Sequence, residues 1–232
     1  PFANFRIAYD TGIDFLDPGL SYTVQGWAIM WNVYLPLLGY KHVNGPDGAT
    51  LVPYLAQDMP QVSSDGKTYT IHLKKGIYFA PDPAFNGKRR ELTMADYVYS
   101  FKRLLDPKVR SPHAWLFEGK VTEFELLDRY TLRLHLAKPD YNMVYVLAHH
   151  PTGAVAREVV EKYGDAQGQV MANPVGTGPY RLAQWVRASR IVLEANPGYR
   201  QTIWDFKPGS DPEDQKIVAQ MKGKRIPQIG RI

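Results

Sequence analysis

Alternation between apolar and polar positions predicts two strands that belong together. In residues 69–74 every second side chain is apolar, and residues 131–136 repeat the pattern. Asp65 and Gly66 precede the first strand and predict a hairpin turn, because Asp-Gly tolerates the positive φ angles of such turns. One apolar face on each strand predicts antiparallel pairing in a single sheet that buries only that face.

The strongest helical pattern lies between these two strands. Thr93 is the predicted N-cap, and Asp96 is favourably placed near the positive end of the helix. An apolar stripe at helical spacing then runs to Leu105, and Pro107 stops the helix. Further helices are predicted over residues 24–38, which Pro36 ends or frays, 154–163, which Gly164 follows, and 212–221.

Short strand-like segments occur near both ends of the chain. They are residues 5–9, 178–185, 190–195 and 227–232. Turn-rich residues separate them, and the sequence has no internal repeat and no long low-complexity linker. Strands interspersed with helices predict an α/β fold of the mixed α+β kind.

Composition limits the class of protein without naming one. The 232 residues are 44% hydrophobic and 22% charged, which is ordinary for a soluble globular protein. Without cysteine, the chain has no disulfide framework, thiolate metal site or cysteine nucleophile. No run approaches the roughly 18 apolar residues of a membrane helix. Residue 1 is proline and no leader pattern follows, so an export signal is expected to have been removed.

The basic character of the chain leaves a nucleic-acid-binding module open as an alternative function. The net charge is +5 and the pI is about 9.2. Such a module needs Lys and Arg gathered on one face together with exposed aromatic residues. Here the basic residues are scattered, and the densest groups, 88–90 and 222–225, are short. This distribution favours an ordinary solvated surface.

Six short phrases in a fixed order are the most specific feature of the sequence. They are residues 15–18 (FLDP), 53–56 (PYLA), 65–79 (DGKTYTIHLKKGIYF), 92–98 (LTMADYV), 174–180 (PVGTGPY) and 193–199 (LEANPGY). Together they resemble the extracellular solute-binding proteins of ABC transporters, family 5. This is the peptide- and nickel-binding type, to which oligopeptide- and dipeptide-binding proteins belong. The resemblance extends over about residues 5–200.

The resemblance implies a lobe like that of type II periplasmic binding proteins, with the small inserted domain of the peptide-binding family. Residues 1–40 and 170–232 are then a discontinuous core lobe, and residues 41–169 are the inserted subdomain. The second lobe of such proteins is expected to be absent from this chain, which corresponds to the N-terminal lobe. The chain is also shorter than its relatives at Lys120 and Val121, which points to a missing loop there.

The same resemblance implies a receptor and not an enzyme. It would capture a small solute, above all a short peptide, in the cleft between two lobes, without a cofactor. Closure about a hinge would precede delivery to the permease subunits of an ABC transporter. Such receptors are periplasmic or otherwise extracytoplasmic. Contact with the membrane is therefore expected only through the permease or a lost lipid anchor, and nucleic acid is not an expected partner.

The loop after the first predicted strand is implied to border the cleft. In relatives this loop offers backbone groups to an extended ligand, and main-chain groups can bind peptides whatever their side chains. The alternative is an ordinary strand-to-turn loop. The ligand-binding residues that the resemblance implies here are Thr11, Gly12, Ile13 and Asp14.

The resemblance also implies roles for two further segments. His113 and Trp115 are implied to form a wall of the cleft, with packing in the core as the alternative for Trp115. The glycine-rich run Gly176, Thr177 and Gly178 lacks the Lys-Ser/Thr of a phosphate loop. It is expected to form a structural turn near the hinge, where backbone change during closure is absorbed.

Metal binding and catalysis are the weaker interpretations. His149 and His150 are adjacent, and neighbouring side chains of a helix or strand point apart, so the pair is a poor chelate and no metal is expected. Asp10, Asp14 and Asp17 could suggest the carboxylate pair of a glycosidase. No arrangement of nucleophile and base accompanies them, so a hydrolase is the least favoured alternative.

Overall fold

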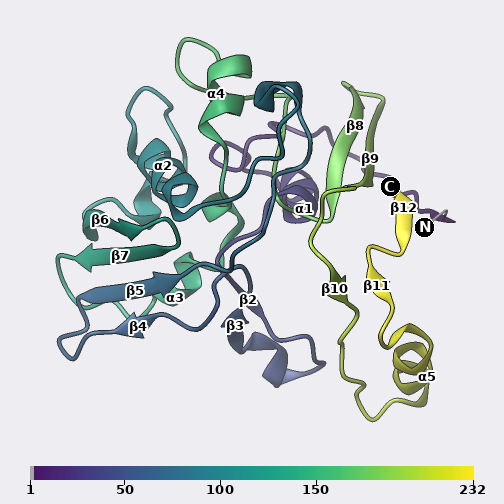
Figure 1. Cartoon of the computed structure of the whole chain (residues 1–232). Helices are drawn as coiled ribbons and strands as arrows, with labels where there is room; N and C mark the ends of the chain where they lie inside the picture. Colours follow the sequence, from purple (N-terminus) through teal and green to yellow (C-terminus); the bar gives the residue numbers. More distant parts are fainter. Residues whose placement is uncertain (1–2) are drawn as a thin grey trace.

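Two four-stranded sheets organise the residues that the structure describes, which are 3–232 (Figure 1). In this computed structural model one sheet has the strand order β4-β5-β7-β6 and the other β1-β12-β9-β8. Two short ribbons, β2-β3 and β10-β11, accompany them. The strands are β1 (Ala3–Asn4), β2 (Leu38–Tyr40), β3 (Leu51–Pro53), β4 (Gln61–Val62), β5 (Thr68–His72), β6 (Val121–Asp128), β7 (Thr131–Leu136), β8 (Tyr180–Val186), β9 (Arg190–Ala195), β10 (Thr202–Ile203), β11 (Arg225–Ile226) and β12 (Ile229–Arg231). The helices are α1 (Val24–Val33), α2 (Met94–Leu105), α3 (Met143–Val146), α4 (Arg157–Tyr163) and α5 (Pro212–Met221).

The predicted pairing of the two alternating segments is confirmed. β5 and β7 pair antiparallel, with Tyr69 opposite Leu134 and Ile71 opposite Leu132. These four side chains are at most 1% exposed, so the apolar face is the buried one. Gly66 in the preceding turn has a φ of 70°, a left-handed value that glycine adopts without strain.

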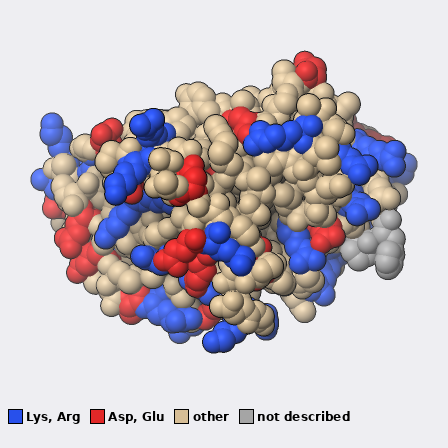
Figure 2. Space-filling model, turned by 90° about the horizontal axis from the view of Figure 1, so that it is seen from above, with Lys and Arg blue, Asp and Glu red and all other residues tan. Residues whose placement is uncertain are grey.

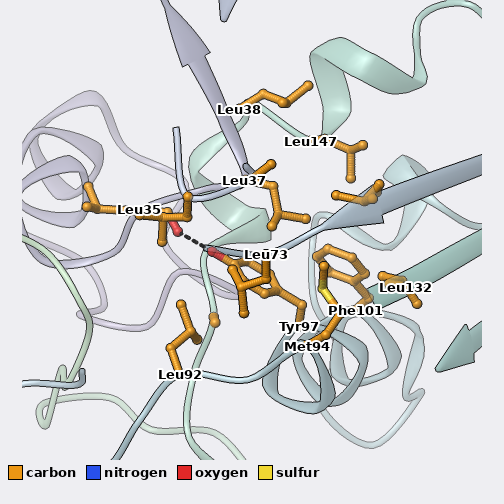
Figure 3. Close-up of a cluster of buried hydrophobic side chains, with 14 of the residues drawn as sticks. Leu35, Leu37, Leu38, Leu73, Leu92, Met94, Tyr97, Phe101, Leu132 and Leu147 are labelled. Atoms are coloured by element: carbon orange, nitrogen blue, oxygen red, sulfur yellow. Dashed lines mark hydrogen bonds between the residues drawn. The ribbon is translucent and has the colours of Figure 1, made fainter. Parts of the chain in front are cut away.

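The predicted start of the central helix is also confirmed. α2 begins after Thr93, whose backbone N–H donates to the Asp96 carboxylate at 2.8 Å. Tyr97 and Phe101 lie one turn apart on the buried face of this helix (Figure 3). The Tyr97 hydroxyl donates to the Leu35 carbonyl at 3.0 Å, as the dashed line in Figure 3 shows. Because burial raises the pKa of Tyr97, the hydroxyl keeps the proton that it donates.

Two predicted helices are shorter in the structure. α1 ends at Val33 and not at residue 38, because Tyr34 is already extended and Pro36 cannot continue the hydrogen-bonded ladder. α4 starts at Arg157 and not at residue 154. Residues 154–156 are buried, and Ala156 has the extended backbone of an N-cap position, so packing overrides their helical preference.

The strands near the two chain ends follow the prediction unequally. β8 and β9 form the expected hairpin, and α5 spans the expected residues. The strand predicted over residues 5–9 is wrong: β1 covers only Ala3–Asn4. After Phe5 donates its N–H to the Arg231 carbonyl at 2.9 Å, the chain leaves the sheet, and Ile7 is 52% exposed.

A buried ion pair ties three distant segments together. Arg103 of α2 bonds both carboxylate oxygens of Asp17, and neither residue is more than 6% exposed. Arg103 also donates to the Gly168 carbonyl at 2.7 Å, and Asp17 accepts from the Val170 N–H at 3.0 Å. Burial alone would lower the pKa of Arg103, but the hydrogen bonds and charge of Asp17 hold it above its usual value.

Besides the apolar cluster around Tyr97 and Phe101, a second cluster of buried side chains lies between α1 and the β8-β9 hairpin. Ile29, Met30 and Val33 of α1 pack there with Tyr180 and Leu193, and none of the five is more than 7% exposed. The mixed α/β fold is therefore confirmed, with its helices packed on sheets. Among the described helices none is long and apolar enough to cross a membrane.

Candidate functional site

Asp14 is the predicted cleft residue with the best-defined surroundings. Its carboxylate accepts hydrogen bonds from the Ser21 hydroxyl at 3.0 Å and from the Tyr22 backbone N–H at 2.7 Å. Gly26 of α1 lies against this carboxylate, and a Cβ on it would sit 2.4 Å from Asp14 Oδ1. The close approach explains why glycine is needed at that position. Asp14 thus fixes the segment that leads into α1.

The rest of the predicted loop runs from solvent toward the core. Thr11 and Gly12 are exposed, and a Cβ on Gly12 would meet no atom within 4 Å. Ile13 is half-buried and packs at the edge of the cluster between α1 and the β8-β9 hairpin. Contact of this loop with a ligand stays a prediction.

His113 meets the same segment as Asp14 from the other side. Its Nε2 lies 2.8 Å from the Ser21 carbonyl, so that nitrogen carries the proton and donates it. The ring is 1% exposed and its centroid lies 5.6 Å from that of Tyr22. Trp115 is not part of this arrangement: it is 55% exposed, and the Lys120 ammonium lies 5.4 Å from its ring.

His113 belongs to a group of six neighbouring rings, which we call the aromatic–imidazole cluster. The ring of Trp27 is central, with centroid distances of 4.6 Å to His150, 5.9 Å to His149 and 6.1 Å to Tyr22. The His150 ring also lies 5.8 Å from His113. The members of the cluster are Tyr22, Trp27, Trp31, His113, His149 and His150.

The structure differs from the expectation that His149 and His150 point apart. Both rings pack against Trp27, because the two residues lie at a short turn and not within a regular helix or strand. In residues 3–232 no three His, Cys, Asp or Glu side chains are arranged so that they could hold a metal ion. His149 meets the Trp27 ring edge-on at an interplanar angle of 86°, and His150 meets it at 45°.

The imidazoles of the cluster are neutral at neutral pH. Burial, with a smaller contribution from the neighbouring imidazoles, lowers the pKa of His150 to about 3. Burial also lowers the pKa of His113 and that of His149. Both ring nitrogens of His150 are buried without a hydrogen-bond partner among the described residues, which adds a desolvation cost that the ring contacts must offset.

The stability of the chain should therefore fall as the solution is acidified. Unfolding exposes His150, whose ring then takes up a proton below its usual pKa of 6.5, whereas the folded form stays neutral down to about pH 3. The free energy of unfolding should be about 2 kcal/mol lower at pH 5 than at pH 7 through this group alone. Urea denaturation across this range measures it. His150→Phe should flatten the slope, and an unchanged slope in this variant would contradict the prediction.

Sequence patterns could have revealed the two tryptophans of the cluster. Val24, Trp27 and Trp31 recur at helical spacing on α1, while Ile29 and Met30 occupy the opposite, buried side. A helix that is apolar on two sides must cover two surfaces. Only the fold shows that the second side meets histidines from distant segments.

The glycine-rich run is defined by close packing. A Cβ on Gly176 would lie 2.1 Å from the Val33 carbonyl oxygen, and one on Gly178 would lie 2.5 Å from that of Asn32. Neither glycine has a left-handed φ, so both are required because the backbone approaches the end of α1. Thr177 between them is 2% exposed. The run packs closely against the end of α1, and its role as a structural turn near a hinge stays a prediction.

Two carboxylates considered as a catalytic pair, Asp14 and Asp17, are held within the fold by different groups. Asp14 and Asp17 are each engaged by separate partners, the first by Ser21 and Tyr22 and the second by Arg103. Figure 2 shows Lys and Arg interspersed with Asp and Glu on the face seen from above. On that face of the described residues the basic side chains do not gather into the continuous surface that nucleic acid requires.

Comparison with known proteins identifies the class. Residues 50–229 match the bacterial extracellular solute-binding proteins, family 5, and the chain belongs to this family. The dipeptide-binding protein of Escherichia coli K12 is 33% identical over an alignment 174 residues long, which covers 69% of this chain and 31% of that protein. The chain thus spans about a third of the length of this relative.

Solved structures share the fold. The periplasmic binding protein DppA from Helicobacter pylori, in complex with the peptide STSA, has a TM-score of 0.69 and 25% identity, covering 90% of this chain and 43% of its own. The binding protein AgaA from A. tumefaciens R10, in complex with agropinic acid, has a TM-score of 0.68 and 26% identity, covering 90% of this chain and 40% of its own. Members of the family are binding proteins, and the ligand differs among those with this fold.

Proposed function

We propose that this chain forms one side of the binding cleft in an extracytoplasmic receptor of an ABC importer. The receptor captures a short peptide and delivers it to the membrane permease subunits. The family match over residues 50–229 carries the proposal. The dipeptide-binding relative and the peptide-bound structural neighbour support a peptide as the ligand.

The geometry around Asp14 and His113 is consistent with one side of a binding cleft. Asp14 and His113 both form hydrogen bonds with the Ser21 and Tyr22 segment, while Tyr22 itself is 63% exposed. A rigidly held support beneath an exposed ring is the arrangement that a binding surface needs, because it limits the ordering that a ligand must cause. Thr11 and Gly12, in the loop that leads to Asp14, are also exposed.

Within that receptor, residues 1–40 and 170–232 form the core lobe, and residues 41–169 form the inserted subdomain. The buried cluster between α1 and the β8-β9 hairpin comes mainly from the core lobe, whereas the larger cluster around α2 and the β4-β5-β7-β6 sheet also includes Leu35, Leu37 and Val175, so the two parts share a packed interface. The Asp17–Arg103 pair fastens the two parts. A rigid lobe of this kind is what hinge closure against a second lobe requires.

Binding of trialanine tests the proposal. The chain should bind this peptide weakly, and Asp14→Ala should weaken binding about tenfold, because it removes two hydrogen bonds that position the Tyr22 segment. Ligand-observed NMR titration gives the Kd of each protein. Asp47→Ala, an exposed loop residue, is the matched control and should bind like the unchanged chain. No binding of trialanine at millimolar concentration would contradict the proposed function.

A further inference from the structure

One side of α1 is an exposed apolar surface. Val24 is 75% exposed and Trp31 is 40% exposed, with half-buried Trp27 between them. Tyr22 extends this surface beyond the helix start, with its ring 6.1 Å from that of Trp27. Soluble proteins rarely leave contiguous apolar patches uncovered, and such patches mark binding surfaces.

The surface has no charge of its own to offer. Beneath it lie the three histidine rings of the aromatic–imidazole cluster, which burial keeps neutral. The charged groups that act on this cluster are Asp14 and Asp17, both on His113. Asp17 is buried and paired with Arg103, and Asp14 already accepts hydrogen bonds from Ser21 and Tyr22, so the rings of the cluster present no charged group of their own.

The support of this surface is rigid. Trp27 Nε1–H donates to the Ser21 carbonyl at 2.9 Å, and His113 donates to the same oxygen at 2.8 Å. Both rings are thereby held in fixed orientation. Stacked or edge-on contact with another ring is favourable in such a geometry, whereas placing an unpaired charge against it is not.

We propose that the aromatic–imidazole cluster is a specificity subsite, which takes an uncharged aromatic side chain of the captured solute and not its charged ends. The inference rests on the proposed function, because it concerns the same cleft wall. Continuity with Asp14 and His113, which brace the wall, places the subsite within the candidate site. The charged ends of a peptide must then be met by groups outside this cluster.

Four tripeptides test the subsite on the 232-residue chain. Ala-Phe-Ala and Ala-Tyr-Ala should bind about tenfold more tightly than Ala-Glu-Ala and Ala-Lys-Ala, in line with the energy of ring–ring contacts. Ligand-observed NMR titration gives each Kd. Tyr22→Ala and Trp31→Ala, which change exposed side chains, should each reduce the preference to about twofold or less. Tyr141→Ala, which is 75% exposed and outside the cluster, should leave it unchanged.

The outcomes separate this inference from the proposed function. Peptides that all bind alike would overturn the subsite and leave the receptor function standing. An aromatic preference that survives both Tyr22→Ala and Trp31→Ala would also overturn it, because the preference would then arise elsewhere. If no tripeptide binds at all, the proposed function fails and the subsite fails with it. Circular dichroism of each variant confirms that the fold is retained.

Discussion

Replacing Arg103 with methionine should lower the free energy of unfolding by about 3–5 kcal/mol, since it leaves a buried carboxylate without its partner. Asp17 is 1% exposed and receives two hydrogen bonds from the guanidinium. Arg103 additionally holds the Gly168 carbonyl. Loss of one side chain therefore loosens the segment before α1, helix α2 and the loop after Gly168 together. Urea denaturation measures the change.

Two controls separate this effect from a general loss of charge. Arg129→Met removes an arginine that pairs with Glu91 but is 58% exposed, and it should change stability by less than about 1 kcal/mol. Asp17→Leu combined with Arg103→Met should recover part of the loss, because no unpaired charge remains buried. If Arg103→Met were no more destabilising than Arg129→Met, the buried Asp17–Arg103 pair would not stabilise the fold as its burial indicates.

Gly176→Ala should destabilise the chain by about 3 kcal/mol, the upper end of the usual cost of overpacking. The added Cβ would lie 2.1 Å from the Val33 carbonyl oxygen and 2.8 Å from the Val33 carbonyl carbon. Both atoms belong to the backbone, so neither can turn away as a flexible side chain could. The end of α1 would have to shift. Thermal and urea denaturation of the variant both report the change.

Gly12→Ala is the matched control for that substitution. A Cβ there would meet nothing within 4 Å, and its φ is not left-handed, so alanine should change stability by less than about 1 kcal/mol. Equal stability of Gly176→Ala and Gly12→Ala would show that the packing at the end of α1 is looser than the structure indicates.

Sequence signals predict a helix or strand correctly where its formation depends on residues within or next to the segment. Helix α5 spans Pro212–Met221 as expected, because Asp211 caps it and proline is favourable at the first helical position. The start of α2 follows from Thr93 and Asp96 in the same way. The β5-β7 pairing was predictable because each strand has one apolar face, and pairing in one sheet lets both faces be buried on the same side.

Contacts between distant segments are what the sequence could not predict. Nothing near His113 indicates that its ring reaches the Ser21 carbonyl, and nothing near Trp27 indicates that His149 and His150 surround it. The same limit applies to the strand expected over residues 5–9. Its apolar residues fit a strand, but in the described residues β12 pairs at this end of the chain only with Ala3 and Asn4, so residues 5–9 are not paired with a strand there.

The pairing of β1 with β12 also sets the order in which the molecule can assemble. The β4-β5-β7-β6 sheet is complete once residue 136 has been synthesised, because all its partners are close in sequence. The other sheet must wait, since Ala3 pairs in parallel with Ile229. Closing a loop of that length costs chain entropy that only late contacts repay, so Ala3 and Asn4 are fixed in the sheet only after β12 has been made. During synthesis, β1 is therefore a segment that a chaperone or protease would meet unpaired until β12 has been made.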